Sequence, residues 1–158
     1  MDKHIISVQV LNRPGAMARI AGLFSGRGFN INSLAVGETE NPDVSRMTIV
    51  VAGDSRVLEQ VHKQLSKLVD VLKVHDVTEG PYVERDLALV RVHAPVARRG
   101  EILELVEVFR ARVVDVGQND LTIELSGSEE KVEAMLELLR PYGISEMARA
   151  GRIALPRA

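Results

Sequence analysis

The sequence predicts an α+β protein made of two consecutive units, each with the element order β-α-β-β-α-β. Short runs alternate apolar and polar residues, as half-buried strands do, and the runs between them repeat apolar residues every three or four positions, as helices do. A Glu79-Gly80-Pro81 break divides the chain, and the order of elements after it repeats the order before it. This order is typical of ferredoxin-like folds, in which two helices cover one face of a four-stranded antiparallel sheet.

The first unit is expected to span residues 1–79. A strand at residues 4–10 leads into an amphipathic helix at residues 16–27. Gly28 is expected to end this helix, because glycine readily adopts the left-handed conformation found just after many helices. A second helix begins after Asp54, which is a good N-cap. The other expected strands lie near residues 30–38, 46–51 and 71–78, with a polar hairpin turn at residues 40–43.

The second unit is expected to span residues 80–158 and to repeat this plan. Ser128 is the expected N-cap of its second helix, and Pro141-Tyr142-Gly143 is expected to end that helix. The expected strands are 87–94, 113–116, 121–125 and 144–148, and the apolar stripes of the expected helices are Ile102, Leu105, Val106 and Phe109 in the first and Val132, Met135, Leu136 and Leu139 in the second.

The strand near residues 31–36 is expected to lie at an edge of the first sheet. It contains no Lys, Arg or Pro that would discourage pairing with another strand. Units of about eighty residues also bury little core by themselves. We therefore expect a homodimer that forms through this edge, and we expect residues 1–79 to fold as a dimer without the rest of the chain.

Composition excludes several classes of function. The chain has no cysteine and no tryptophan, only 3% aromatic residues and a formal net charge of −2. Thiol catalysis and thiolate metal sites are therefore excluded, and neither a basic nucleic-acid footprint nor an aromatic stacking platform is expected. The polar start of the chain and the lack of a long apolar run predict a soluble, cytoplasmic protein with no membrane contact.

The junction Asn12-Arg13-Pro14-Gly15-Ala16 is the best candidate for a binding site. Pro and Gly between a strand and a helix set a tight turn, and the exposed backbone N–H groups of the new helix attract a small anion such as a carboxylate. The Asn12 amide carries both a donor and an acceptor, so it can contact a second polar group on the same ligand. Taken alone, the same residues are also typical of an ordinary turn.

No residue pattern indicates catalysis. The four histidines have no metal-ligand spacing, and His75 and Asp76 are neighbours on an expected strand, so their side chains point to opposite faces. Arg98-Arg99 and the arginines near the end of the chain are candidates for a phosphate or partner surface, although arginines interspersed with acids are more often simply solvated. We therefore expect neither catalytic residues nor a metal site.

Long stretches of the chain resemble known proteins. Residues 12–25 look like the start of an ACT domain, which is an amino-acid-sensing module. The first unit most closely resembles the small, regulatory subunits of acetolactate synthase (acetohydroxyacid synthase), on the evidence of residues 27–37, 45–51 and 59–74. In the second unit, the best matches to the same family are residues 83–90 and 109–116. The chain departs from that family's pattern at Leu11 and Asn32, where relatives usually or often carry an acidic residue.

The resemblance implies a non-catalytic subunit of an enzyme in branched-chain amino acid biosynthesis. It implies a large catalytic subunit as partner, which this chain activates and makes sensitive to feedback inhibition by valine, or in some relatives by leucine or isoleucine. Thiamine diphosphate, magnesium and, in part of the family, FAD would belong to the large subunit, and this chain would hold no cofactor. The effector would lie between two ACT domains, in contact with Asn12, Gly15, Ala16, Met17, Asn30 and Ile31.

The family's roles for these residues agree with the turn chemistry. The N–H groups of Gly15 and Ala16 would bind the carboxylate, and Met17 and Ile31 would contact a branched side chain. A Gly15→Asp change is expected to remove the effector response and to spare folding unless Gly15 needs a positive φ. The sequence argues against two of three alternative functions. The lack of a catalytic or metal-binding pattern argues against a small enzyme on the same scaffold, and the near-neutral charge with few aromatic residues argues against a nucleic-acid-binding protein. An ACT-type sensor for another enzyme or for transcription remains the alternative.

Overall fold

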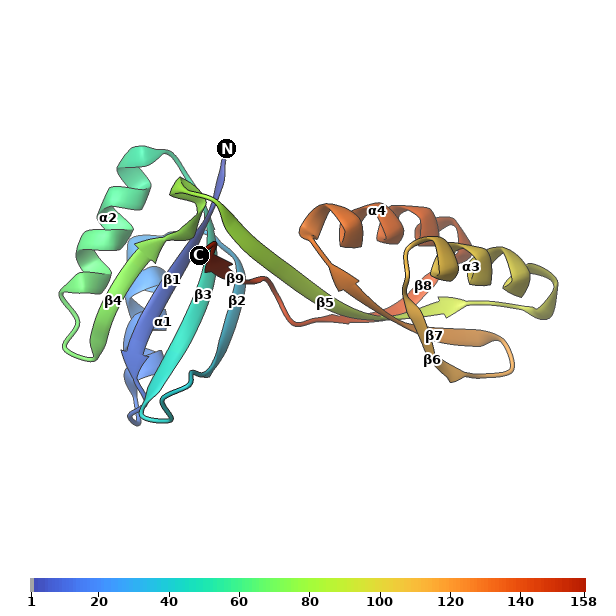
Figure 1. The fold of residues 1–158 in the computed structure, drawn as a ribbon, viewed down its shortest axis with the longest axis horizontal. Helices are drawn as coiled ribbons and strands as arrows, with labels where there is room; N and C mark the ends of the chain where they lie inside the picture. The colour runs from blue at the N-terminus through green and yellow to red at the C-terminus, as the bar shows by residue number, and fades with distance from the viewer. Residues whose placement is uncertain (1) are drawn as a thin grey trace. The chain divides into compact units, whose positions relative to one another are not determined.

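The computed structural model describes residues 2–158 and divides into two compact units, both with the predicted α+β, ferredoxin-like order of elements (Figure 1). One unit contains the residues before Glu84 together with Arg152–Ala158, and the other contains Glu84–Gly151. The division therefore differs from the expected one at residues 79 and 80. The first unit continues to Val83, and the end of the chain belongs to it as well.

The first unit contains a four-stranded antiparallel sheet with the strand order β2-β3-β1-β4. The strand β2 is thus at an edge, as predicted. In chain order the elements are β1 (Lys3–Leu11), α1 (Ala16–Arg27), β2 (Ile31–Glu38), β3 (Val44–Ala52), α2 (Ser55–Ser66), β4 (Val71–Asp76) and the short 3₁₀ helix η1 (Val77–Glu79).

The helix ends of this unit follow the local rules read from the sequence. The side chain of Asp54 accepts a hydrogen bond from the backbone N–H of Val57 at 3.0 Å, which caps the start of α2. Gly28 ends α1 with a φ of 69°, and its N–H donates to the last carbonyls of the helix. Both predicted helix ends are confirmed.

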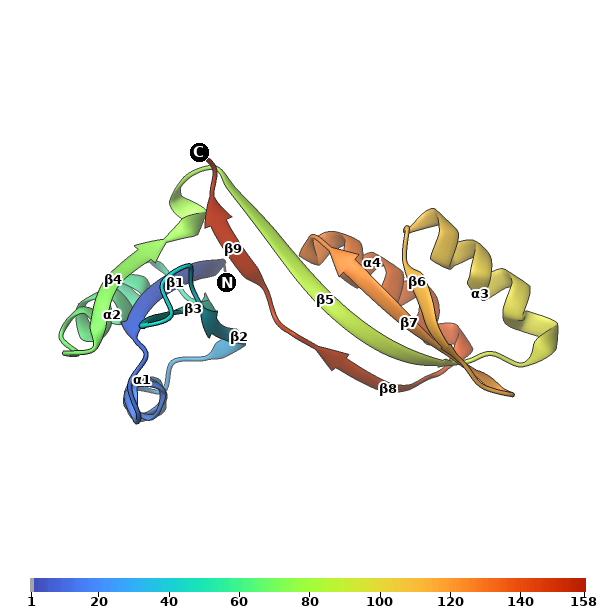
Figure 2. The same cartoon turned by 60° about the horizontal axis from the view of Figure 1, so that its bottom comes forward.

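Apolar residues form a cluster on each face of the first sheet. On the helix side, alternate residues of β1 and β3 pack against α1 and α2 around the buried Ile20, Phe24 and Leu65. On the other side, Ile5, Val50 and Val77 pack against Ala154. Ala154 lies on β9 (Ile153–Pro156), a strand that the sequence did not predict. The strand β9 pairs with the beginning of β5 (Tyr82–His93) (Figure 2). Next to this pairing, the Arg157 N–H donates to the Pro81 oxygen at 2.9 Å.

The second unit repeats the topology of the first. Its strand order is β6-β7-β5-β8. In both sheets the strands therefore lie in the order second, third, first and fourth, counted along the chain within each unit. Ser128 caps α4 by accepting the Lys131 N–H at 3.3 Å, as predicted. The elements are β5 (Tyr82–His93), α3 (Val96–Val108), β6 (Arg112–Val116), β7 (Asp120–Gly127), α4 (Glu129–Leu139), the 3₁₀ helix η2 (Arg140–Tyr142) and β8 (Ile144–Arg149).

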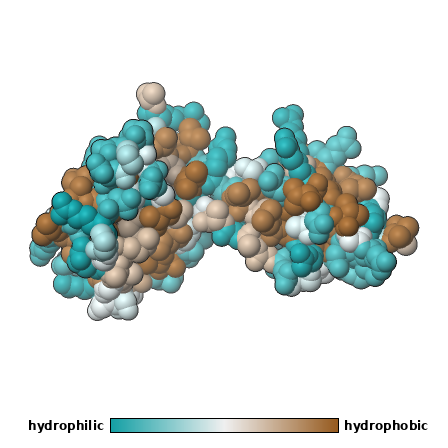
Figure 3. Space-filling view, turned by 90° about the horizontal axis from the view of Figure 1, so that it is seen from below, coloured by the Kyte–Doolittle hydropathy of each residue, from teal (hydrophilic) through white to brown (hydrophobic). Residues whose placement is uncertain are grey.

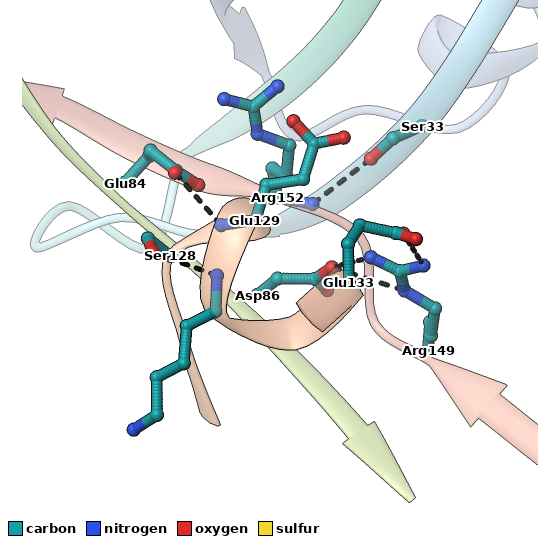
Figure 4. Close-up of polar contacts among 9 residues, drawn as sticks. Ser33, Glu84, Asp86, Ser128, Glu129, Glu133, Arg149 and Arg152 are labelled. Atoms are coloured by element: carbon teal, nitrogen blue, oxygen red, sulfur yellow. Dashed lines mark hydrogen bonds and ion pairs between the residues drawn. The ribbon is translucent and has the colours of Figure 1, made fainter. Parts of the chain in front are cut away.

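A group of charged residues joins β5, α4 and β8 within the second unit. The Arg149 guanidinium lies between the carboxylates of Asp86 and Glu133, and the Glu84 carboxylate accepts the Glu129 N–H at 3.1 Å (Figure 4). Burial alone would lower the pKa of Arg149, but its hydrogen bonds to Asp86 and Glu133 raise that pKa above its usual value. Stability from a raised pKa is lost only as the pH rises through the folded value, so Arg149 keeps its charge throughout the neutral range.

Not all apolar residues are buried. Figure 3 shows hydrophobic residues gathered in patches at the surface of each unit, between polar ones. In the first unit, Met17, Leu34 and Val36 each keep more than a third of their surface exposed. Within residues 2–158, no helix combines the length and the apolar character that crossing a bilayer requires.

Candidate effector site

The loop between β1 and α1 is a tight turn that is fixed at several points. The Leu11 N–H donates to the Asp70 backbone oxygen and the Asn12 N–H donates to the Asp43 backbone oxygen, both at 2.8 Å. Gly15 is the N-cap of α1 with a φ of 84°, in the left-handed region that favours glycine. The backbone of the predicted binding loop is therefore held in one conformation by residues that lie far along the chain.

Two polar groups of the loop that are expected to bind the effector already have hydrogen-bond partners within the chain. The Ala16 N–H is used within the turn, where it donates to the Arg13 oxygen at 3.2 Å. In this conformation the turn already engages that donor, and the expectation that Ala16 binds the effector carboxylate stays a prediction. The side-chain amide of Asn12 donates to the Pro42 oxygen at 3.3 Å, and Asn12 is exposed.

Two arginines add positive charge to the loop. Both contact the buried carboxylate of Asp70: Arg19 through a hydrogen-bonded ion pair, and Arg13 with a nitrogen–oxygen distance of 3.8 Å. The Arg19 guanidinium also lies beside Gly15, since a Cβ built on Gly15 would come within 3.1 Å of Arg19 Nη1. More than half of each arginine side chain is exposed, so both cations remain accessible to an anion at the loop.

Sequence reasoning missed this charged environment. Arg19 follows Gly15 by one helical turn, which places it on the same side of α1, and that spacing was a usable signal. The role of Asp70 was not readable, because its contact with Arg19 joins residues 51 positions apart.

An apolar pocket of about 220 Å³ lies beside the loop, between α1 and the edge strand β2. Met17 and Ile31, the two residues expected to contact a branched side chain, both line it. The pocket therefore brings together only Met17 and Ile31 of the six expected effector residues. The other four, Asn12, Gly15, Ala16 and Asn30, do not line it. The remaining lining residues are Ile20, Ala21, Phe24, Ser25, Phe29, Leu34, Met47 and Ile49.

The edge strand β2 borders this pocket. Leu34 lines the pocket and is 40% exposed, and Val36 on the same side of the strand is 42% exposed. The pairing of β2 with β3 shifts its register between Ile31 and Ser33, so Asn32 sits at a β-bulge. One of the two departures from the family pattern therefore lies at an irregular position of the edge. Farther on, the Ser33 hydroxyl accepts the Arg152 N–H at 3.0 Å (Figure 4).

The other candidates noted in the sequence are engaged in structural contacts. Asp76 contacts His4 at 3.0 Å, whereas the neighbouring His75 belongs to the opposite face of the sheet, as predicted. Arg99 donates to the backbone oxygens of Ala94, Gly117 and Gln118, and Arg98 lies over the Tyr142 ring. Among residues 2–158, no group of three or more His, Asp or Glu side chains is arranged to hold a metal ion.

Comparison with known protein families assigns both units. Residues 6–73 match a family described as the AHAS small subunit-like ACT domain, and residues 85–158 match one described as the small subunit of acetolactate synthase. A probable acetolactate synthase small subunit of Archaeoglobus fulgidus is 57% identical, with 98% of this chain and 97% of that protein aligned. The acetolactate synthase small subunit of Aquifex aeolicus is 54% identical over 98% of this chain and 81% of its own length.

A solved structure shows the same fold. The crystal structure of the acetolactate synthase small subunit from Thermotoga maritima aligns with a TM-score of 0.91 and 42% identity, covering all of this chain and 99% of that one. The shared fold extends through both units, and each of the two sequence matches covers 98% of this chain. The chain therefore belongs to the family of acetolactate synthase small subunits.

Proposed function

We propose that this chain is the regulatory subunit that binds the catalytic large subunit of an acetolactate synthase, raises its activity and makes it sensitive to feedback inhibition by valine or another branched-chain amino acid. Membership of the small-subunit family supports the pairing with a large subunit. The family match through residues 85–158 favours this function over an ACT-type sensor for another enzyme, because it extends beyond the ACT domain.

The single observation that carries the effector proposal is the apolar pocket lined by Met17 and Ile31, because Met17 directly follows the loop in the chain. A branched side chain buried in the pocket would contribute roughly 1.5–3 kcal/mol. The effector carboxylate would lie at the loop, near the guanidinium groups of Arg13 and Arg19, with Asn12 contacting a second polar group. A small amphipathic amino acid thus matches both parts of the site.

The site would be completed by a second copy of the chain. An open edge strand presents backbone donors and acceptors that another strand can pair with. Exposed Leu34 and Val36 on β2 and exposed Met17 on α1 would be covered when two copies pair through β2. Asn30, just before β2, would then reach the effector bound by the other copy, which accounts for its place outside the pocket of its own chain.

Catalysis would belong entirely to the partner. We assign thiamine diphosphate, magnesium and, where present, FAD to the large subunit, and no cofactor to this chain. A role without chemistry of its own agrees with the contacts described above, in which His4, Arg98 and Arg99 are used for structure.

A valine titration of the reconstituted enzyme tests the effector site. We expect Asn12→Ala to raise the valine concentration needed for half-maximal inhibition by at least about tenfold, since a lost hydrogen bond to a charged group costs about 1.5–3 kcal/mol. The matched control is Gln60→Ala, an exposed amide on α2 away from the loop. An Asn12→Ala enzyme that melts normally and responds to valine like the Gln60→Ala enzyme would show that the loop is only a turn.

A further inference from the structure

A second pocket lies on the face of the first sheet that is turned away from α1 and α2. It has a volume of about 260 Å³ and is bounded on one side by Leu155 and Pro156 of β9. The sheet contributes residues of β1, β3 and β4, namely Ser7, Gln9, Arg46, Lys73 and His75. This pocket shares no lining residue with the effector pocket.

The register of the sheet explains why basic residues meet there. Gln9 of β1 is paired with Arg46 on one neighbouring strand and with Lys73 on the other, so the two cations flank it on the same face. One step along the sheet, Ser7 is paired with His75 of β4. With strands about 4.8 Å apart, the backbones that carry Arg46 and Lys73 are separated by about 10 Å, which leaves room for a small ligand between the side chains.

The cations of this pocket have no acidic neighbours. No Asp or Glu lines it, and among residues 2–158 neither Arg46 nor Lys73 forms an ion pair. The chain is not short of carboxylates, since it has 22 acidic residues against 20 basic ones. Two like charges on either side of one residue repel each other, and a bound anion would remove that cost.

Arg46 is also held in position. Its Nη1 donates to the Ser7 hydroxyl at 2.7 Å, and Ser7 is only 3% exposed. This hydrogen bond uses one of the five N–H donors of the guanidinium, so the others can bind an oxyanion. Lys73, His75 and the Gln9 amide add donors from two further strands.

We propose that this pocket binds a phosphate or pyrophosphate group. Two permanent cations on opposite sides of Gln9 match a multiply charged oxyanion better than the single carboxylate of a neutral amino acid. No aromatic residue lines the pocket, so recognition rests on the phosphate oxygens and not on a stacked base. Leu155 and Pro156 supply an apolar wall beside them.

Calorimetric titration of the full-length chain with pyrophosphate, and separately with inorganic phosphate, tests the proposal. We expect binding that Lys73→Gln weakens by about tenfold or more, since the change removes a charge-assisted contact with the oxyanion. The matched control is Lys67→Gln, an exposed lysine at the end of α2 that does not line the pocket, which leaves the affinity unchanged. Tighter binding of pyrophosphate than of phosphate indicates a polyphosphate ligand, and equal binding indicates a single phosphoryl group.

A second variant makes the test independent of one side chain. Arg46→Gln should weaken binding at least as much as Lys73→Gln, and a thermal melt shows whether its lost contact with Ser7 harms the fold. The proposal is overturned by no binding at millimolar pyrophosphate, by equal losses for Lys73→Gln and Lys67→Gln, or by a loss caused by Arg13→Gln instead, which would place the anion at the effector loop. Weakened association of Lys73→Gln with the large subunit, without any anion binding, also overturns it in favour of a protein contact.

Discussion

Gly15 shows how one backbone angle limits what a mutation can test. Its φ of 84° is a conformation that costs an L-residue about 1–2 kcal/mol, and a Cβ there would meet Arg19 Nη1 at 3.1 Å. The Gly15→Asp change that the sequence suggested is therefore strained. Because it would combine a folding defect with a binding defect, it cannot isolate the effector site, and Asn12→Ala is the cleaner variant.

We expect Gly15→Ala to lower the free energy of unfolding by about 1 kcal/mol, because alanine must adopt a left-handed conformation there. The matched control is Gly26→Ala, a glycine within α1 that has open space around its Cβ position. That change should raise stability by up to about 1 kcal/mol, because glycine is a poor helix former. Thermal melts of the two full-length variants compare them directly, and equal melting temperatures would contradict this account of the turn.

The strand β9 is the element that changes the domain division. Its Ala154 is 6% exposed and packs on Ile5, Val50 and Val77, which cover the face of the first sheet opposite the helices. A fragment of residues 1–79 would lack β9 and leave this apolar cluster uncovered, and the expectation that it folds as a dimer stays a prediction. The first unit is thus built from residues near both ends of the described chain, because Arg152–Ala158 belong to it together with the residues before Glu84.

We expect Ala154→Asp to destabilise the protein by at least about 2 kcal/mol, because it places a carboxylate without a partner among buried aliphatic side chains. The neighbouring Ile153→Asp is the control, since Ile153 is 58% exposed. Urea unfolding monitored by circular dichroism should separate the two variants clearly. If Ala154→Asp unfolds at the same urea concentration as Ile153→Asp, then β9 does not hold the sheet as described.

Most of the regular elements could be predicted because their signals are local. The helix α1 has the predicted bounds, and Asp54 and Ser128 cap their helices as expected, since each cap acts within a few residues. The strand β9 was missed because its four residues are too few to show a period and its partner β5 lies about seventy residues earlier. The candidate site follows the same rule. Met17 and Ile31, which line the apolar pocket, were named from local sequence patterns that resemble the family, whereas the Arg19–Asp70 contact depends on the fold.

The molecule as a whole combines an ACT unit with a second unit of the same topology, and the family match covers both. In the first unit, the apolar pocket is lined by Met17 at the start of α1 and by Leu34 of the edge strand β2. Effector binding and dimer formation through β2 would therefore use adjoining residues. Valine would then stabilise the dimer by binding to it preferentially.

We expect Leu34→Lys to shift the full-length protein from dimer to monomer, because it places a charge on the exposed side of the edge strand β2. The matched control is Leu87→Lys on β5, since Leu87 and Leu34 are 42% and 40% exposed. Sedimentation velocity at equal protein concentrations measures the change. A Leu34→Lys protein that sediments like the Leu87→Lys protein would exclude β2 as the dimer edge.

Reconstitution with the cognate large subunit tests the central claim most directly. The measurement is the rate of acetolactate formation from pyruvate by this chain alone, by the large subunit alone and by the two together, each with thiamine diphosphate and magnesium. The account predicts no turnover by this chain alone, a higher rate for the mixture than for the large subunit, and a fall toward the lower rate when valine is added. Turnover by this chain alone, or a large subunit whose rate does not change when this chain is added, would contradict it.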